Sequence, residues 1–173
     1  MTLEELSGQI PDYARDLKIN LSNVLRQEEL TRQQLWGTAV ACAIASRNPL
    51  LTGAVMEEAA KELTPVALNA AKSAAAIMGM NNVFYRFQHL AQNDKYATMP
   101  ARLRMQAIRT HGSDPVDFEL WCAAVSAING CGACVASHER VVREKGLAEE
   151  VVLAAVRIAS VLHAVAAVLD AEA

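Results

Sequence analysis

Apolar residues in this chain recur at helical spacing, and no segment shows the sustained apolar–polar alternation of a strand. Alanine is abundant along the whole chain. The pattern therefore predicts an all-α protein. At 173 residues the chain is most simply one domain covering 1–173, because a domain typically holds about 100–200 residues.

Helix boundaries are marked by capping residues, by prolines that follow them, and by Asn-Pro or Gly signals that end a helix. The segment between Gln92 and Met99 is the most irregular internal stretch. The predicted helices run from Thr31 to Ser46, Pro65 to about Met78, Pro115 to about Ile128, Cys131 to Lys145, and Ala148 to Asp170.

A faint internal repeat relates AIMGM at 76–80 to AINGC at 127–131, and each copy follows a helix opened by proline. This predicts a duplicated helix pair in which each glycine lies between two helices. Met80 and Val83 would then take the positions of Cys131 and Cys134, so that the first copy is structural and the second chemical.

Charge and hydropathy argue against several classes of function. The net charge is −3, from 16 basic and 19 acidic residues, whereas a nucleic-acid binder usually has a concentrated basic face. The most apolar stretch, 151–169, contains Arg157 and His163. Since a bilayer span needs about 20 nearly uncharged residues, we expect a core or interface helix and no membrane partner. A mean hydropathy of +0.15 hints at surface hidden between subunits.

The chain begins with acidic residues and no apolar run follows them, so we expect no secretory signal and a cytoplasmic location. Four cysteines in such a chain do not describe a secreted disulfide framework. Cys42 and Cys122 stand alone and are expected to be small buried hydrophobes. Cys131 and Cys134 form a Cys-x-x-Cys, which carries most of the functional information.

The Cys-x-x-Cys spacing predicts a specific arrangement if a helix begins near Cys131. Cys131 and Cys134 would lie on one face, where a disulfide needs little backbone movement. Both would lie near the positive end of the helix dipole, which favours a thiolate. His138 follows one turn after Cys134, and an imidazole there can accept or return a proton.

Other functions of the pair have to be weighed. Zinc could be held by Cys131, Cys134, His138 and a carboxylate such as Glu119, although no second cysteine pair is present. Covalent haem attachment is excluded because Val135 stands where histidine is required. A thioredoxin-like fold would need a strand before the motif. The small Gly132-Ala133 spacer indicates accessible sulfurs rather than a buried inert pair. A dithiol redox site on a helical scaffold is favoured.

Glu119 lies in the first turns of the helix that precedes the motif, on a face of small residues with Ala123, Ser126 and Gly130. Two interpretations stay open. Glu119 is either a solvated acid favoured by the helix dipole, or a carboxylate that orients His138 or relays its proton through a water.

The remaining polar and aromatic residues carry weaker signals. His163 is expected to be packed or at an interface, and His89 and His111 to be solvated. Trp36 and Trp121 are expected core anchors. A polar cluster after Gly79 has no chemistry beyond capping or subunit contacts, and three nearby arginines are expected to form a solvated face. The cluster is Asn81, Asn82, Tyr85 and Arg86; the arginines are Arg102, Arg104 and Arg109.

Taken together, these residues resemble the alkyl hydroperoxide reductase D family, within the wider carboxymuconolactone decarboxylase-like family. The resemblance covers nearly the whole chain, including Tyr13-Ala14 and the Leu35-Trp36-Gly37 segment. It rests on Glu119, Cys131, Cys134 and His138, on MGMNNVFYR at 78–86 and on FELW at 118–121.

The resemblance implies a multi-helix fold with a repeated helix pair, assembled as a homotrimer. It also implies an antioxidant thiol peroxidase and disulfide reductase that keeps the peroxiredoxin alkyl hydroperoxide reductase C reduced. Electrons would come from a lipoyl group on a dihydrolipoamide acyltransferase, which lipoamide dehydrogenase reduces. No cofactor would be bound to the chain itself.

The resemblance further assigns roles to the site residues. Cys134 would be the nucleophile that passes through sulfenic acid, and Cys131 the resolving thiol and proton donor, so that a Cys131–Cys134 disulfide forms. His138 and Glu119 would relay protons. Some members carry a histidine immediately before the second cysteine, where this chain has Ala133. A decarboxylase on the same fold is an alternative, but such a reaction has no need of the Cys-x-x-Cys.

Overall fold

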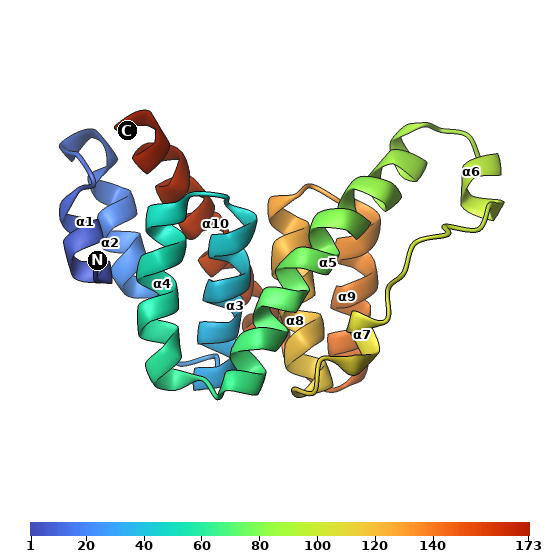
Figure 1. Cartoon of the computed structure of the whole chain (residues 1–173), viewed down its shortest axis with the longest axis horizontal. Helices are drawn as coiled ribbons and strands as arrows, with labels where there is room; N and C mark the ends of the chain where they lie inside the picture. The colour runs from blue at the N-terminus through green and yellow to red at the C-terminus, as the bar shows by residue number, and fades with distance from the viewer.

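The computed structural model describes all of residues 1–173 and contains helices but no strands, as predicted. Figure 1 shows an elongated arrangement with α1 and α2 near one end and α6 at the other. The helices are α1 (Leu3–Gly8), α2 (Arg15–Val24), α3 (Arg32–Ala45), α4 (Pro49–Glu62), α5 (Pro65–Leu90), α6 (Lys95–Thr98), α7 (Ala107–Thr110), α8 (Pro115–Ile128), α9 (Gly132–Glu144) and α10 (Glu149–Ala171), with a 3₁₀ turn η1 at Asp12–Ala14.

The predicted helix starts are confirmed. The hydroxyl of Thr31 accepts a hydrogen bond from the backbone N–H of Gln34 in a full capping box at the start of α3. Thr64 and Asp114 each cap a helix whose first residue is proline. Asn48 does the same for α4, a helix that is absent from the predicted set, since Asn48-Pro49 is expected only to end the preceding helix. These caps satisfy backbone donors that have no partner within the helix.

The predicted end of α5 is wrong, because the helix continues past Met78 to Leu90. Gly79 therefore lies inside a helix and not between two helices, which corrects the expected form of the repeat. A single interior glycine costs only about 1 kcal/mol relative to alanine. Gly130, by contrast, adopts a φ of 67° and separates α8 from α9, since a positive φ cannot continue a helix.

One hydrophobic core joins the two halves of the chain, and α3 lies at its centre with residues 35–43 all buried. The single-domain organisation remains a prediction. Trp121 is fully buried and Trp36 nearly so, as predicted. A Cβ on Gly37 would stand 2.2 Å from the Trp121 ring. Helices α3 and α8 therefore pack too closely for any larger residue at position 37.

Helix α10 is the one helix long and apolar enough to cross a bilayer on composition alone, and half of its most apolar window is buried inside the structure. Ile158, Leu162 and Val165 are fully buried in the common core. The apolar stretch is accounted for as a core helix, as expected from the sequence.

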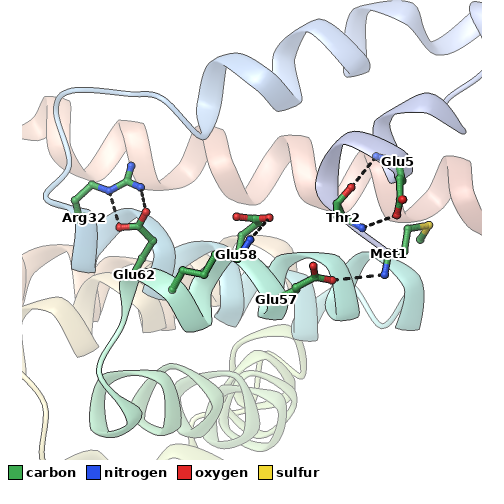
Figure 2. A network of polar contacts seen from close by, with 8 residues as sticks. Met1, Thr2, Glu5, Arg32, Glu57, Glu58 and Glu62 are labelled. Carbon is green, nitrogen blue, oxygen red and sulfur yellow. Dashed lines mark hydrogen bonds and ion pairs between the residues drawn. The ribbon is translucent and has the colours of Figure 1, made fainter.

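Polar contacts attach the N-terminal segment and the start of α3 to α4 (Figure 2). The amino group of Met1 lies 3.5 Å from a carboxylate oxygen of Glu57. Nε of Arg32 donates to Glu62 at 3.1 Å. These pairs are largely exposed, so each contributes at most about 1 kcal/mol.

Candidate active site

The Cys-x-x-Cys lies at the corner where α8 ends and α9 begins. Asn129 ends α8, and the left-handed Gly130 turns the chain. The N–H of Cys131 donates to the carbonyl of Ser126 at 3.1 Å. Cys131 is the N-cap of α9, and its Sγ accepts from the N–H of Cys134 at 3.3 Å. The break predicted at Asn129-Gly130 is what places both cysteines at a helix start.

Cys131 and Cys134 are joined in a disulfide, with their Cα atoms 5.3 Å apart. The expectation of exposed sulfurs is wrong. Cys131 is 0% exposed and Cys134 6%. The small residues Gly132 and Ala133 are themselves exposed, but the two cysteines are buried at the start of a helix that packs against α8 and α5.

The start of α9 favours a thiolate on Cys134 once the disulfide is reduced. Cys134 is the third residue of a 13-residue helix. Unpaired N–H groups and the helix dipole there stabilise negative charge, and cysteines at such positions are typically reactive. The geometry therefore suits reversible dithiol–disulfide chemistry.

Glu119 and His138 form a close pair beside the disulfide. Nδ1 of His138 lies 2.6 Å from a carboxylate oxygen of Glu119. The side chains of His138 and Glu119 are 13% and 20% exposed, so Glu119 is not a solvated acid. It contacts His138, as the second interpretation expects, and its role in proton relay stays a prediction. A carboxylate on Nδ1 fixes the ring and leaves Nε2 as the nitrogen that can exchange a proton.

Helix α8 is held in register for this contact by a carboxylate at its start. Asp117 is buried and accepts hydrogen bonds from the side-chain amides of Gln33 at 2.7 Å and Gln34 at 2.9 Å. Both glutamines belong to the start of α3. Glu119 therefore projects from a helix turn that is attached to the core.

A small cavity of about 250 Å³ opens beside Cys134. Its buried floor contains Cys134, Met78 and Asn81, and exposed residues of α9 form its rim. Most of the lining is apolar, and Cys131 is not part of it. The lining residues are Met78, Asn81, Tyr85, Met105, Ile108, Ala133, Cys134, Ser137 and His138.

The α8–α9 corner is held against α5 by a network of polar contacts. The amide of Asn82 donates to Ser126 Oγ at 2.9 Å and accepts from Asn129 at 2.9 Å. Arg86 donates to the carbonyl of Asn129. Two members of the cluster after Gly79, Asn82 and Arg86, thus connect α5 to the corner between α8 and α9. Sequence reasoning singled out Asn82 and Arg86 without finding this role, because the partner residues lie far along the chain.

Two lining residues, Met105 and Ile108, went unnoticed in the sequence. They come from the segment that links α6 to α8, where no periodicity or capping signal points to a site. Met105 accepts a weak contact from the Tyr85 hydroxyl at 3.8 Å. That contact places the linking segment over the cavity.

The other histidines differ partly from expectation. His111 is not solvated: its ring stacks on Phe118 at a centroid distance of 4.0 Å. Desolvation lowers the pKa of His111, and the nearby carboxylates of Glu119 and Asp114 oppose that shift. His163 is exposed on α10, so it is not packed within the chain, and its expected place at an interface stays a prediction. His89 is exposed as predicted. The three arginines 102, 104 and 109 are exposed, also as predicted.

Cys42 and Cys122 are buried and free, as expected. Desolvation raises the pKa of both thiols well above the ordinary value for cysteine. Neither thiol is therefore ionised near neutral pH.

The zinc interpretation finds no support in the geometry. No three His, Cys, Asp or Glu side chains lie close enough to hold a metal ion. The sulfurs of Cys131 and Cys134 are bonded to each other, and His138 is engaged by Glu119.

The chain is similar to known proteins over its whole length. The family model described as the carboxymuconolactone decarboxylase family matches residues 94–173, which include all four site residues. Proteins named alkyl hydroperoxide reductase AhpD are similar over the full chain. That of Solibacter usitatus is 67% identical over 100% of this chain and 98% of its own length. That of Acidobacterium capsulatum is 64% identical over 99% of this chain and 94% of its own length.

A third relative of the same name, from Streptomyces griseus, is 54% identical over 100% of this chain and 98% of its own length. Similarity of this extent, together with the matched family model, shows that the chain belongs to the AhpD family within the carboxymuconolactone decarboxylase family.

Proposed function

We propose that the protein is an antioxidant alkyl hydroperoxidase and disulfide reductase that works through the Cys131–Cys134 dithiol. The observation that carries the proposal is a disulfide at a helix N-terminus, next to an apolar cavity and the His138–Glu119 pair. The name of the relatives, alkyl hydroperoxide reductase, supports the peroxide as substrate.

In the first step, the Cys134 thiolate attacks the terminal oxygen of the hydroperoxide. A sulfur–oxygen bond forms, the O–O bond breaks, and an alkoxide leaves. His138 supplies the proton that turns the alkoxide into an alcohol, and Glu119 stabilises the imidazolium before that transfer. Cys134 becomes a sulfenic acid.

In the second step, the sulfur of Cys131 attacks the sulfenic sulfur of Cys134. The disulfide forms and water leaves, which takes the sulfenic oxygen and the proton of the Cys131 thiol. One hydroperoxide and two thiols have then become one alcohol, one water and one disulfide.

Cys134 is assigned as the attacking residue for two reasons. It lines the cavity and retains a small exposed area, whereas Cys131 does neither. It also lies one helical turn before His138, within reach of the same proton carrier. Cys131 is then left as the resolving thiol.

The disulfide must be reduced by an external dithiol. We propose that the donor is a dihydrolipoyl group on a dihydrolipoamide acyltransferase, which lipoamide dehydrogenase reduces in turn. Thiol–disulfide exchange from a dithiol opens the Cys131–Cys134 bond and closes the lipoyl ring. The reduced pair also reduces the disulfide of a peroxiredoxin, alkyl hydroperoxide reductase C. The proposal includes no cofactor bound to the chain, and a cytoplasmic location.

We also propose assembly as a homotrimer. Apolar side chains of Val83, Phe87 and Leu90 are each more than half exposed. They lie on one face of the C-terminal half of α5, which projects beyond the bundle toward α6 (Figure 1). An exposed apolar face of this kind is typical of a protein–protein interface. The mass of the native assembly tests this proposal.

The functional test measures loss of tert-butyl hydroperoxide with dihydrolipoamide as reductant. We expect turnover by the native chain and none by Cys131→Ser or Cys134→Ser, because neither thiol completes the cycle alone. Normal turnover by Cys131→Ser would overturn the proposal. Activity on a carboxymuconolactone that survives loss of both cysteines would instead favour a decarboxylase.

A further inference from the structure

Asn81 lines the cavity beside Cys134, and its side-chain oxygen is buried without a hydrogen-bond partner. The residue is 4% exposed, and no protein group donates a hydrogen bond to its Oδ1. Its neighbour Asn82 is 0% exposed, but its amide is paired with both Ser126 and Asn129. Two adjacent asparagines of α5 therefore differ in their hydrogen bonding. The side-chain oxygen of Asn82 accepts a hydrogen bond from the protein, and that of Asn81 does not.

An unpaired buried acceptor disfavours the folded state, and nearly all buried polar atoms in proteins have a partner. Such an atom calls for an explanation at its own site. Asn81 lines the same cavity as Cys134 and His138, and the other buried or half-buried lining groups there are thioether, aromatic and aliphatic. The polar groups inside the cavity are thus His138, the Asn81 amide and the Tyr85 hydroxyl, and the last of these contacts the Met105 sulfur.

We propose that Asn81 is a substrate-positioning residue, whose side-chain oxygen accepts the hydroperoxyl proton of an alkyl hydroperoxide. The inference rests on the proposed function and adds a residue to it. The alkyl group of the substrate lies against the apolar wall formed by Met78, Met105 and Ile108.

The chemistry of a hydroperoxide fits this role. ROOH has a single hydrogen-bond donor, the O–H of its terminal oxygen, and that oxygen is the one a thiolate attacks. An acceptor that binds this hydrogen directs the terminal oxygen at Cys134 and the alkoxy oxygen away from it. When the S–O bond forms and the O–O bond breaks, the hydrogen stays on the sulfenic oxygen, and the leaving alkoxide takes its proton from His138.

The cavity also favours an alkyl substrate over hydrogen peroxide. A volume of about 250 Å³ lies below the usual range for drug-sized ligands and suits a small alkyl hydroperoxide. Each methylene removed from water strengthens binding by about fourfold. Small alkyl hydroperoxides can gain from the apolar wall, and hydrogen peroxide cannot.

The test uses the reduced full-length protein and measures the rate of Cys131–Cys134 disulfide formation with tert-butyl hydroperoxide. Asn81→Leu removes the acceptor at similar volume, and Asn81→Ala removes it and opens space. We expect both variants to react about tenfold more slowly, the usual effect of one lost hydrogen bond.

The control reagent is methyl methanethiosulfonate, whose sulfur is attacked by the same thiolate with loss of methanesulfinate, and which has no O–H or N–H to donate. Its rate with Cys134 should be unchanged in both variants. If the thiosulfonate rate falls as far as the peroxide rate, Asn81 acts on Cys134 itself and the proposal is overturned. An unchanged peroxide rate would overturn it as well.

Asn82→Leu is the matched control for stability. It leaves the buried hydroxyl of Ser126 and the amide of Asn129 without their partner, so its melting temperature should fall. Asn81→Leu removes an atom that has no partner, so its melting temperature should stay the same or rise. A fall equal to that of Asn82→Leu, with normal peroxide kinetics, would make Asn81 purely structural.

These outcomes are separable from failure of the proposed function. If Cys134→Ser abolishes turnover while both Asn81 variants react normally, only the positioning role fails. If turnover survives Cys134→Ser, the dithiol mechanism itself fails.

Discussion

The protein contains two sets of cysteines that are equally buried and chemically unlike. Cys42 and Cys122 lie inside α3 and α8 and remain free thiols. Cys131 and Cys134 lie at the start of α9 and form a disulfide. Depth of burial does not separate the two sets, because all four residues are at most 6% exposed.

The two sets differ in the chemical environment of each sulfur. Apolar surroundings raise the pKa of Cys42 and Cys122, so these thiols stay protonated and inert. Cys134 instead meets a helix N-terminus, a cavity and the pair His138–Glu119. A reactive cysteine can thus be buried, provided that its partners stabilise the thiolate and a substrate has a path to it.

The largest predicted effect comes from replacing the cysteines of each set in turn. Cys131→Ser or Cys134→Ser should lower peroxide turnover by at least about a thousandfold, to background, since the dithiol cycle needs both sulfurs. Cys42→Ala and Cys122→Ala should retain turnover and lose stability only, by up to a few kcal/mol for the cavity left behind. Steady-state peroxide loss and thermal melting measure the two effects. Equal loss of turnover in the variants of both sets would contradict the claim that only Cys131 and Cys134 take part in the reaction.

The second prediction concerns the proton carrier that only one set possesses. His138→Phe should slow turnover by about a hundredfold and change its pH profile, because a positioned acid–base group is typically worth 10²–10⁴-fold. Glu119→Gln should have a smaller effect in the same direction, since it keeps the contact but not the charge. An unchanged pH profile in His138→Phe would mean that the proton travels by another route.

The third prediction tests whether the corner between α8 and α9 must be rigid. Ser126→Ala leaves the Asn82 amide without its acceptor, at a cost of about 1–3 kcal/mol in free energy of unfolding. Chemical denaturation measures the loss. We expect faster alkylation of reduced Cys134 as well, because the corner opens more often. Alkylation of Cys42 should accelerate only at denaturant concentrations that unfold the whole protein.

The smallest predicted effect concerns His111, which is near Glu119 but hydrogen-bonded to the backbone of Ser113. Its pKa is lowered from 6.5 in the folded protein, so the unfolded chain binds the proton first as the pH falls. The free energy of unfolding should therefore decrease as the pH drops below about 6.5 toward the folded pKa.

His111→Phe keeps an aromatic ring on Phe118 and removes the titration. In this variant the free energy of unfolding should depend less on pH below about 6.5. Turnover should stay unchanged, in contrast to His138→Phe. Urea denaturation at a series of pH values checks the stability, and loss of turnover would show that His111 belongs to the site.

Most of the fold could be predicted because its signals are local. Caps at Thr31, Thr64 and Asp114 and the glycine at 130 depend on residues within one or two turns. The end of α5 could not, because Gly79 resembles Gly130 in sequence. The structure shows that the helix continues through Gly79 to Leu90. The residues after Gly79, such as Asn82 and Arg86, bond to the α8–α9 corner, which lies more than 40 residues further along the chain.

The site was predictable where spacing decides it. The arrangement of Cys131, Cys134 and His138 follows from one helix, and the pairing of His138 with Glu119 emerges once α8 and α9 pack. Burial of the sulfurs and the lining residue Met105 depend on how remote segments cover the corner, which no local pattern in the sequence records.

The most direct test of the central claim is the intact mass of the reduced protein before and after one equivalent of tert-butyl hydroperoxide, followed by peptide mapping. The account predicts a loss of about two hydrogens located at Cys131–Cys134, reversed by dihydrolipoamide, with Cys42 and Cys122 still free thiols. Oxidation located at Cys42 or Cys122, or no oxidation at Cys131–Cys134, would contradict it.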